Sequence, residues 1–243
     1  NIPWTGRLTP FRIYGNLYFV SIEPASSHLI ATEKGLIFGI PVISDALSGL
    51  GVYLELGFAP RNIRYIIHPH GHYDHLGATK ALLGIAQAKT FLGIQDIDYA
   101  NGKLDLTWTK KLGHIYHETF EKLLNGVALF DQDVVRLGSK EIKCLSTPDH
   151  TPGTFSFFFN VQENGRVYCA EMHGGVGLNS MSRSFLDIYG LPYDCRNQFF
   201  ASLERLKKEV VDIRGVIMWD AITLWKGGTH EYSKENLFIA PQE

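Results

Sequence analysis

The sequence predicts an α/β fold made of two strand-rich halves, each followed by helical stretches. Three observations lead to this prediction. Short runs of β-branched and aromatic residues recur in both halves, apolar residues at a spacing of three to four follow them, and no low-complexity linker separates the halves. Two such halves could pack sheet on sheet with the helices outside, although periodicity alone does not determine that topology. At 243 residues, one domain over residues 1–243 is the expected organisation.

The first half opens with strands and turns and continues with a helix, a buried strand and a second helix. Strand-like runs occupy residues 11–14, 17–20 and 27–32, with turns at residues 15–16 and 33–35. Helical spacing extends over residues 44–56, and Gly57 provides a C-terminal stop. The apolar run at residues 63–68 is expected to be a strand, and helical spacing resumes over residues 77–88.

The second half repeats this order of elements. Strands are predicted over residues 141–145, 154–161, 166–170 and 216–218. Helices are predicted over residues 116–124 and 193–210. The later helix carries apolar residues at a spacing typical of an amphipathic helix: Phe199, Phe200, Leu203, Leu206 and Val210.

Composition and charge exclude several classes of protein. Hydrophobic residues make up 45% of the chain and charged residues 20%, which is typical of a globular protein with a large core. The formal net charge is −2 at pH 7 and no run of Lys or Arg is present, so no nucleic-acid partner is expected. The longest apolar runs, residues 35–42 and 127–130, are far shorter than the roughly 20 residues that cross a bilayer, so no membrane partner is expected.

The cysteines are too few and too scattered for a disulfide framework: Cys144, Cys169 and Cys195. At most one bridge could form. The chain begins at Asn1, which would suit removal of a secretory signal and equally a chain shortened in another way. A secreted or periplasmic location is therefore favoured over a cytoplasmic one, and the sequence leaves the oligomeric state open.

A dense cluster of potential metal ligands follows the strand predicted at residues 63–68. It reads His70-Gly71-His72-Tyr73-Asp74-His75 and lies on the loop before the next helix, where α/β folds usually display functional residues. Two histidines two residues apart can point to the same side of an extended loop and bind one cation. Asp74 and His75 could hold a second cation nearby. Without a metal, so many imidazoles would repel one another when protonated.

A later histidine could complete a site of three histidines. His150 lies in the turn-rich segment 147–154, between two predicted strands. Three neutral imidazoles and an open position form a zinc site that lowers the pKa of bound water to about 7. His68, by contrast, is expected to support the site or the fold rather than to bind a metal.

These motifs resemble those of the metallo-β-lactamase superfamily. The chain is most similar to the third subclass of metallo-β-lactamases and to isothiocyanate-hydrolase-like relatives. The resemblance is carried by residues 70–77 and 149–154, together with the opening patterns at residues 11–20 and 27–35. It implies an αβ/βα sandwich, in which two mixed sheets carry helices on their outer faces and the site lies at one edge of the sheets.

The resemblance also implies the roles of individual residues. His70, His72 and His150 would bind the first metal, and Asp74 and His75 the second. One or two Zn²⁺ ions would hold a hydroxide that attacks a small-molecule substrate such as a β-lactam, a lactone or an isothiocyanate. Asp74 and His75 are the expected catalytic residues, with Asp74 orienting the hydroxide. Aromatic residues could wall an apolar pocket, although packing in the core is the simpler role for each: Trp108, Tyr116, Trp219 and Trp225.

The sequence departs from the family pattern at the second metal. Relatives normally supply a last histidine where this chain has Asp220, so the second site would be more anionic and would accept Mn or Fe more readily. Alternatively, Asp220 is a solvated loop residue and the second site is weak or empty. His230 is the other candidate for the last ligand of the second metal.

Further departures concern residues around the site. Glu171 stands where many relatives have a bridging Asp and could be a bridge, a proton shuttle or neither, whereas His173 is expected to line the pocket. The first strand pair of relatives ends in a buttressing Asp, and residues 36–40 contain no carboxylate. Loss of such a group often weakens metal affinity or activity by about 10–100-fold. Two alternative functions are a non-hydrolytic Fe or Mn enzyme and a metal-retaining binding protein with little hydrolase activity.

Overall fold

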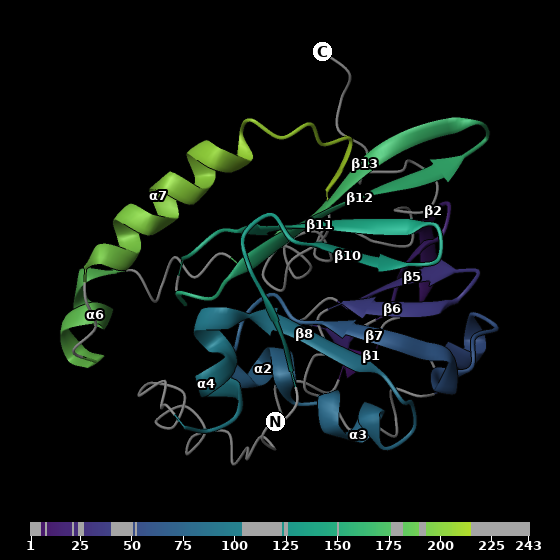
Figure 1. Cartoon of the computed structure of the whole chain (residues 1–243), viewed down its shortest axis with the longest axis horizontal. Helices are drawn as coiled ribbons and strands as arrows, with labels where there is room; N and C mark the ends of the chain where they lie inside the picture. The colour runs from purple at the N-terminus through teal and green to yellow at the C-terminus, as the bar shows by residue number, and fades with distance from the viewer. Residues whose placement is uncertain are drawn as a thin grey trace.

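Two facing β-sheets with helices on their outer sides form the architecture of this computed structural model (Figure 1). The structure describes residues 6–7, 9–20, 22–23, 27–39, 51, 53–103, 123, 126–149, 151–175, 182–189 and 193–214. For Tyr73 and Asp74 it describes the backbone only.

The first sheet has seven strands in the order β2-β3-β5-β6-β7-β8-β9. Its strands are β2 (Phe11–Tyr14), β3 (Leu17–Phe19), β5 (His28–Thr32), β6 (Gly35–Gly39), β7 (Ile63–Ile67), β8 (Lys89–Gly93) and β9 (Val127–Leu129). Neighbours from β2 to β6 pair antiparallel, and neighbours from β6 to β9 pair parallel. Parallel strands end at the same edge of a sheet, so the segments that follow β7 and β8 begin side by side.

The second sheet has five strands in the order β10-β11-β12-β13-β14. Its strands are β10 (Val134–Leu137), β11 (Lys140–Ser146), β12 (Phe155–Glu163), β13 (Arg166–Met172) and β14 (Ile213–Arg214). All neighbours pair antiparallel except β13 and β14, which are parallel. A separate short pair consists of β1 (Gly6–Arg7) and β4 (Ile22–Glu23).

One hydrophobic core fills the space between the two sheets. Alternate residues of the longer strands contribute to it, with Ile37 and Ile67 from the first sheet and Phe157 and Phe159 from the second. The β2–β3 hairpin approaches the second sheet closely, because a Cβ on Gly15 would lie 2.4 Å from the carbonyl oxygen of Gln162. Two sheets that share one core form the sandwich that the resemblance implied.

The described helices lie outside the two sheets. They are η1 (Pro60–Asn62), α2 (Tyr73–Leu76), α3 (Thr79–Leu83), η2 (Ile94–Asp96), α4 (Ile97–Ala100), α6 (Arg183–Tyr189) and α7 (Asp194–Leu206). A second apolar cluster joins Leu36 and Phe38 on the outer face of β6 to Leu82 of α3. Figure 1 shows α3 and α4 on the side of the first sheet away from the second, and α7 beside the second sheet. The αβ/βα architecture is thus confirmed.

Most of the predicted elements that fall within the described residues are confirmed. The runs predicted as strands at residues 63–68, 141–145, 154–161 and 166–170 form β7, β11, β12 and β13. Residues 53–55 are helical, and Gly57 follows them with a φ of +79°, as expected of a C-terminal stop. The predicted strand at residues 216–218 and, apart from Leu123, the predicted helix at residues 116–124 lie outside the described residues.

Two helix predictions need correction. The helix predicted over residues 77–88 is shorter, because α3 ends at Leu83 and Gly84, a poor helix former, begins a turn. The later helix is confirmed as α7 but ends at Leu206, and its apolar residues do not share one buried face. Phe199 is buried, whereas its neighbour Phe200 is 63% exposed, since adjacent residues lie about 100° apart around a helix. Within the described part of the chain, no helix is long and apolar enough to cross a membrane.

Candidate metal centre

Three buried histidines converge where β7 ends. His70, His72 and His75 are 1%, 2% and 7% exposed. The ring centroid of His70 lies 4.7 Å from that of His72 and 4.1 Å from that of His75. His75 lies in α2 rather than on an open loop, and its backbone N–H donates to the carbonyl oxygen of His72 at 3.0 Å. This short helical turn brings the third imidazole against the first.

A backbone contact fixes the tautomer of His70. Its Nδ1 lies 2.9 Å from the carbonyl oxygen of Gly174, which can only accept a hydrogen bond. Nδ1 therefore carries the proton and Nε2 carries the lone pair that a metal would bind. Metal-binding histidines usually have this arrangement, in which the second ring nitrogen donates to a carbonyl or carboxylate. The chemistry and orientation of His70 thus fit a zinc site.

His68 has the supporting role that the sequence predicted. It is fully buried, its Nδ1 lies 2.9 Å from the carbonyl oxygen of Phe91, and its Nε2 lies 2.8 Å from Oγ1 of Thr79. Burial lowers the pKa of His68 to about 4, so the ring is neutral near pH 7. Because both nitrogens are engaged, His68 joins β7 to β8 and α3 and offers no lone pair to a metal.

The segment around His150 lies against the first histidine loop. The backbone N–H of Phe155 donates to the carbonyl oxygen of Pro69 at 2.8 Å, which joins the start of β12 to the residue before His70. Asp149, 1% exposed, accepts a 2.9 Å hydrogen bond from Oγ1 of Thr154 that stabilises the turn. His150 itself lies outside the described residues, but the residues on both sides of it are buried beside the cluster.

A buried aspartate that the sequence did not single out connects the two loops. Asp96 is 0% exposed. Its carboxylate accepts hydrogen bonds from the backbone N–H of Gly71, the backbone N–H of Gly153 and the hydroxyl of Thr151. Residues 36–40 contain no carboxylate, but Asp96 supplies one to the histidine loop from another segment. No motif marks Asp96, because its partners are mainly backbone groups of distant residues.

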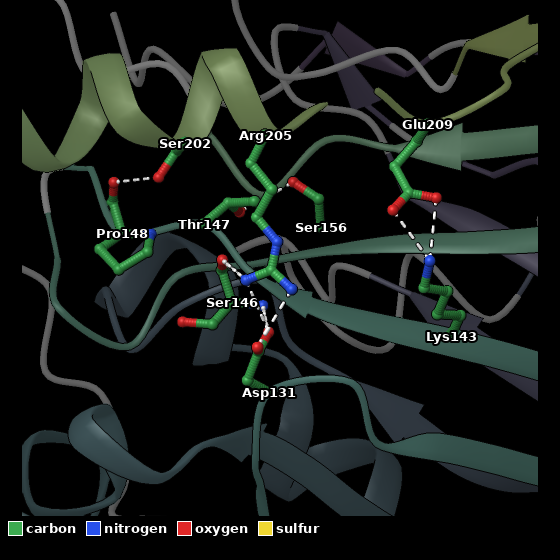
Figure 2. Close-up of polar contacts among 9 residues, drawn as sticks. All are labelled: Asp131, Lys143, Ser146, Thr147, Pro148, Ser156, Ser202, Arg205 and Glu209. Carbon is green, nitrogen blue, oxygen red and sulfur yellow. Dashed lines mark hydrogen bonds and ion pairs between the residues drawn. The ribbon is translucent and has the colours of Figure 1, made fainter. Parts of the chain in front are cut away.

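Helix α7 holds the segment that leads to His150 from the outer side (Figure 2). Oγ of Ser202 donates to the carbonyl oxygen of Pro148 at 2.8 Å, and Arg205 donates to the carbonyl oxygen of Ser146 at 3.2 Å. Arg205 also forms an ion pair with Asp131 at 2.8 Å. The helix therefore anchors both ends of the short run from β11 to Asp149.

A second set of contacts links the same segment to the loop after β13. Oγ1 of Thr147 and Oγ of Ser156 lie 2.9 Å apart, and Oγ of Ser156 accepts a hydrogen bond from the backbone N–H of Gly174 at 3.1 Å. Gly174 is the residue whose carbonyl oxygen accepts from His70. A continuous hydrogen-bonded path thus runs from Thr147 to the first histidine.

Glu171 lies in β13, and His173 lies in the loop that follows it. Ala170 and Met172 face the core between the sheets, so strand alternation places Glu171 on the opposite face, in register with Phe158 of β12. Nδ1 of His173 accepts a hydrogen bond from the backbone N–H of Gly175 at 3.1 Å. These positions favour neither residue as a metal ligand, and the expectation that His173 lines the pocket stays a prediction.

Several predicted site residues fall outside what the structure describes. For Asp74 only the backbone is described, and His150, Asp220 and His230 are not described, nor are the four aromatic residues expected near the pocket. Among the described residues, no group of three His, Cys, Asp or Glu side chains is arranged to hold a metal ion. The structure brings His70, His72 and His75 together. The full set of predicted metal ligands stays a prediction.

Comparison with known proteins agrees with this geometry. The family model described as the Metallo-beta-lactamase superfamily matches residues 23–166. The chain is 26% identical over 166 residues to a probable metallo-hydrolase, YflN, of Bacillus subtilis (strain 168), a match that covers 64% of this chain and 59% of that protein. It is 25% identical over 128 residues to an N-acyl homoserine lactonase of a Bacillus species, covering 53% and 45%. The matches thus span about three fifths or less of these relatives.

Solved structures share the fold over more of the chain. The FEZ-1 metallo-beta-lactamase of Legionella gormanii has a TM-score of 0.83 at 23% identity, covering 98% of this chain and 90% of that one. The GOB-18 metallo-beta-lactamase of Elizabethkingia meningoseptica has a TM-score of 0.75 at 27% identity, covering 88% and 78%. Both comparisons cover most of this chain.

Proposed function

Because the chain belongs to the metallo-beta-lactamase superfamily, we propose that it is a metal-dependent hydrolase of small molecules. The observation that carries this proposal is the group of three buried imidazoles, in which the Nδ1 proton of His70 is held by the carbonyl oxygen of Gly174. Two imidazolium charges at this spacing would repel, so the packing favours the neutral rings that bind zinc.

We assign the metal ligands as the motifs indicate. His70, His72 and His150 would hold the first ion, and Asp74 and His75, with Asp220, would hold the second. Zinc suits a site of imidazoles, and the added carboxylate at position 220 would allow manganese or iron in the second site. A bound zinc ion supplies Lewis-acid chemistry and a water nucleophile near neutral pH.

The chain's own residues prepare the site for this chemistry. Gly174 orients His70, the α2 turn places His75 against it, and the contacts of Asp96 and α7 hold the segments on both sides. Asp74 follows His72 by two residues and would orient the attacking water through its carboxylate. Rigid support of this kind maintains the ligand geometry that a metal site requires.

The chemistry of such a site and the similar proteins support a proposal for the substrate class. A site of this kind attacks an electrophilic carbon next to a heteroatom, which occurs in lactones, β-lactams and isothiocyanates. A lactonase and several β-lactamases are among the proteins that resemble this chain. We therefore propose a small neutral or anionic substrate with such a bond.

The test combines metal analysis with a hydrolysis panel. The purified protein is expected to contain one or two equivalents of metal and to hydrolyse at least one lactone, β-lactam, thioester or isothiocyanate in a chelator-sensitive manner. His72→Ala should lower the metal content and reduce turnover more than about 100-fold. Loss of a residue that only supports a ligand costs about 10–100-fold. Full activity of this variant would overturn the site assignment. Metal without any turnover across the panel would instead favour a binding protein.

A further inference from the structure

Asp96 receives three hydrogen-bond donors from two separate loops. Its Oδ2 lies 2.7 Å from the backbone nitrogen of Gly71 and 2.7 Å from Oγ1 of Thr151. Its Oδ1 lies 2.9 Å from the backbone nitrogen of Gly153. An ionised carboxylate accepts hydrogen bonds only, so its chemistry matches these three donors. Hydrogen bonds from backbone N–H groups to a buried carboxylate are among the stronger ones in proteins.

The partners of Asp96 flank the predicted ligands directly. Gly71 lies between His70 and His72, and Thr151 follows His150. The parallel pairing of β7 and β8 brings the segment containing Asp96 beside the first loop, whereas Thr151 and Gly153 precede β12 of the second sheet. A single side chain therefore bridges the loop of His70 and His72 and the segment that follows position 150.

The backbone around Asp96 leaves no room for adjustment. A Cβ on Gly153 would lie 2.4 Å from Cγ of Asp96, and a Cβ on Gly93 would lie 2.1 Å from the carbonyl oxygen of Gly153. A Cβ on Gly71 would lie 3.0 Å from Cβ of Asp96. At these three positions only glycine lets the backbone segments pack this closely around the Asp96 carboxylate.

The first strand pair carries no carboxylate near its end. The strand that ends at Gly39 has no carboxylate, and a Cβ on Gly39 would lie 2.8 Å from Cε of Met172. A side chain at position 39 would require the flexible end of Met172, which is 2% exposed, to shift. The support for the histidine loop has to come from elsewhere, and Asp96 is a buried carboxylate that reaches it.

We propose that Asp96 is a positioning residue that holds the His70–His72 loop and the segment around His150 at the separation needed to bind one metal ion. It takes the place of the supporting Asp that the first strand pair lacks. This inference rests on the proposed function, because it concerns the metal site of that function. It assigns to Asp96 no contact with metal or substrate.

The test compares two carboxylates two residues apart. Asp96→Asn keeps the shape of the side chain but turns an NH₂ group toward an N–H or hydroxyl donor. Asp98→Asn is the matched control, since Asp98 forms an exposed ion pair with Lys103. Zinc affinity is measured by chelator competition, and ligand geometry is read from the visible spectrum of the cobalt-substituted protein. Unfolding of the metal-free proteins monitors the fold.

Asp96→Asn is expected to lower zinc affinity about 10–100-fold and to change the cobalt spectrum, whereas Asp98→Asn leaves both unchanged. Wild-type zinc affinity and an unchanged spectrum in folded Asp96→Asn would overturn the inference while leaving the proposed function intact. A wild-type protein that binds no metal would overturn both. The two failures are therefore distinguishable.

A second pair of variants covers the case in which Asp96→Asn does not fold. Thr151→Val removes the hydroxyl that donates to Asp96 and keeps the shape of the side chain, whereas Thr151→Ser keeps the hydroxyl. We expect Thr151→Val to weaken zinc binding several-fold relative to the wild type. Thr151→Ser should lose no more than half as much zinc affinity as Thr151→Val. Equal zinc affinities for the two variants would contradict the proposal.

Discussion

The imidazole of His70, which follows a strand of the first sheet, is held by the carbonyl oxygen of Gly174, which follows a strand of the second sheet, at 2.9 Å. The orientation of the first predicted ligand therefore depends on how the two sheets pack against each other. Any change that shifts Gly174 should act on metal binding even though Gly174 touches no metal.

Gly174→Ala should weaken metal binding and destabilise the protein. Its Cβ would lie 2.3 Å from the carbonyl oxygen of Phe155, so the backbone must move and the contact with His70 is lost. A cost of about 1–3 kcal/mol is expected for such overpacking. Chelator competition and urea unfolding measure the two effects. Gly165→Ala, in an open turn with a φ of +77°, is the control and should lower stability without affecting metal affinity. Equal metal affinities for both variants would disprove this coupling.

His28 should make the metal-free protein less stable in mild acid. It is 1% exposed, and burial lowers its pKa to about 4. Below about pH 6.5 the unfolded chain binds a proton at this residue, whereas the folded protein does not until the pH approaches 4. Stability is therefore unaffected above this window and falls as the pH drops through it, by up to an amount on the order of 3 kcal/mol.

Two substitutions at His28 distinguish the effect of its protonation on stability from the effect of burying a polar group. Among the described residues, neither ring nitrogen of His28 has a hydrogen-bond partner. His28→Leu and His28→Asn should each remove about half of the stability loss in acid, because burial also lowers the pKa of His68 to about 4 and His68 contributes the other part. Only His28→Leu should keep the wild-type stability at pH 7, because Asn buries a polar amide. Urea unfolding at pH 7, 5.5 and 4.5 in the presence of chelator measures both effects. A wild-type slope in His28→Leu would show that another group is responsible.

Arg205→Ala should loosen helix α7 from the second sheet. Arg205 bonds both Asp131 and the carbonyl oxygen of Ser146, and its loss should cost about 1–2 kcal/mol, because a bond to a charged donor and an ion pair disappear together. Lys207→Ala is the control, two residues further on at the end of α7, because Lys207 pairs with Glu204 on the exposed surface and should contribute almost nothing. Denaturant unfolding compares the two. A loss of stability as large in the control would argue against a specific role for Arg205.

Asp220→His should raise the occupancy of the second metal site if position 220 supplies a ligand. Imidazole is the ligand that relatives place there, and a site of imidazoles binds zinc in preference to harder metals. Elemental analysis should then show a stoichiometry closer to two zinc ions per chain, with less manganese or iron. An unchanged stoichiometry and metal content would mean that Asp220 is not a ligand.

The sequence was sufficient to predict elements that depend on local patterns. Apolar and aromatic runs placed β7, β11, β12 and β13, because burial on one or both faces leaves a clear periodicity. Helix boundaries were predicted less accurately, because Gly84 ended α3 earlier than expected. The burial of helix faces was also hard to predict. Phe200 is exposed, because the residues that decide which face of α7 is buried come from elsewhere in the chain. The ligand cluster was visible because its residues are contiguous and chemically distinctive.

By itself, the sequence determined the superfamily, the α/β class and the segment that carries His70, His72 and His75. Only the tertiary structure decided how that segment is supported. Asp96 lies 25 residues from Gly71 and 57 from Gly153, and Gly174 lies 104 residues from His70. The groups that make these contacts are mostly backbone N–H and C=O groups, which nearly every residue carries. No residue pattern marks such groups, so the support of the site becomes visible only when the sheets are packed together.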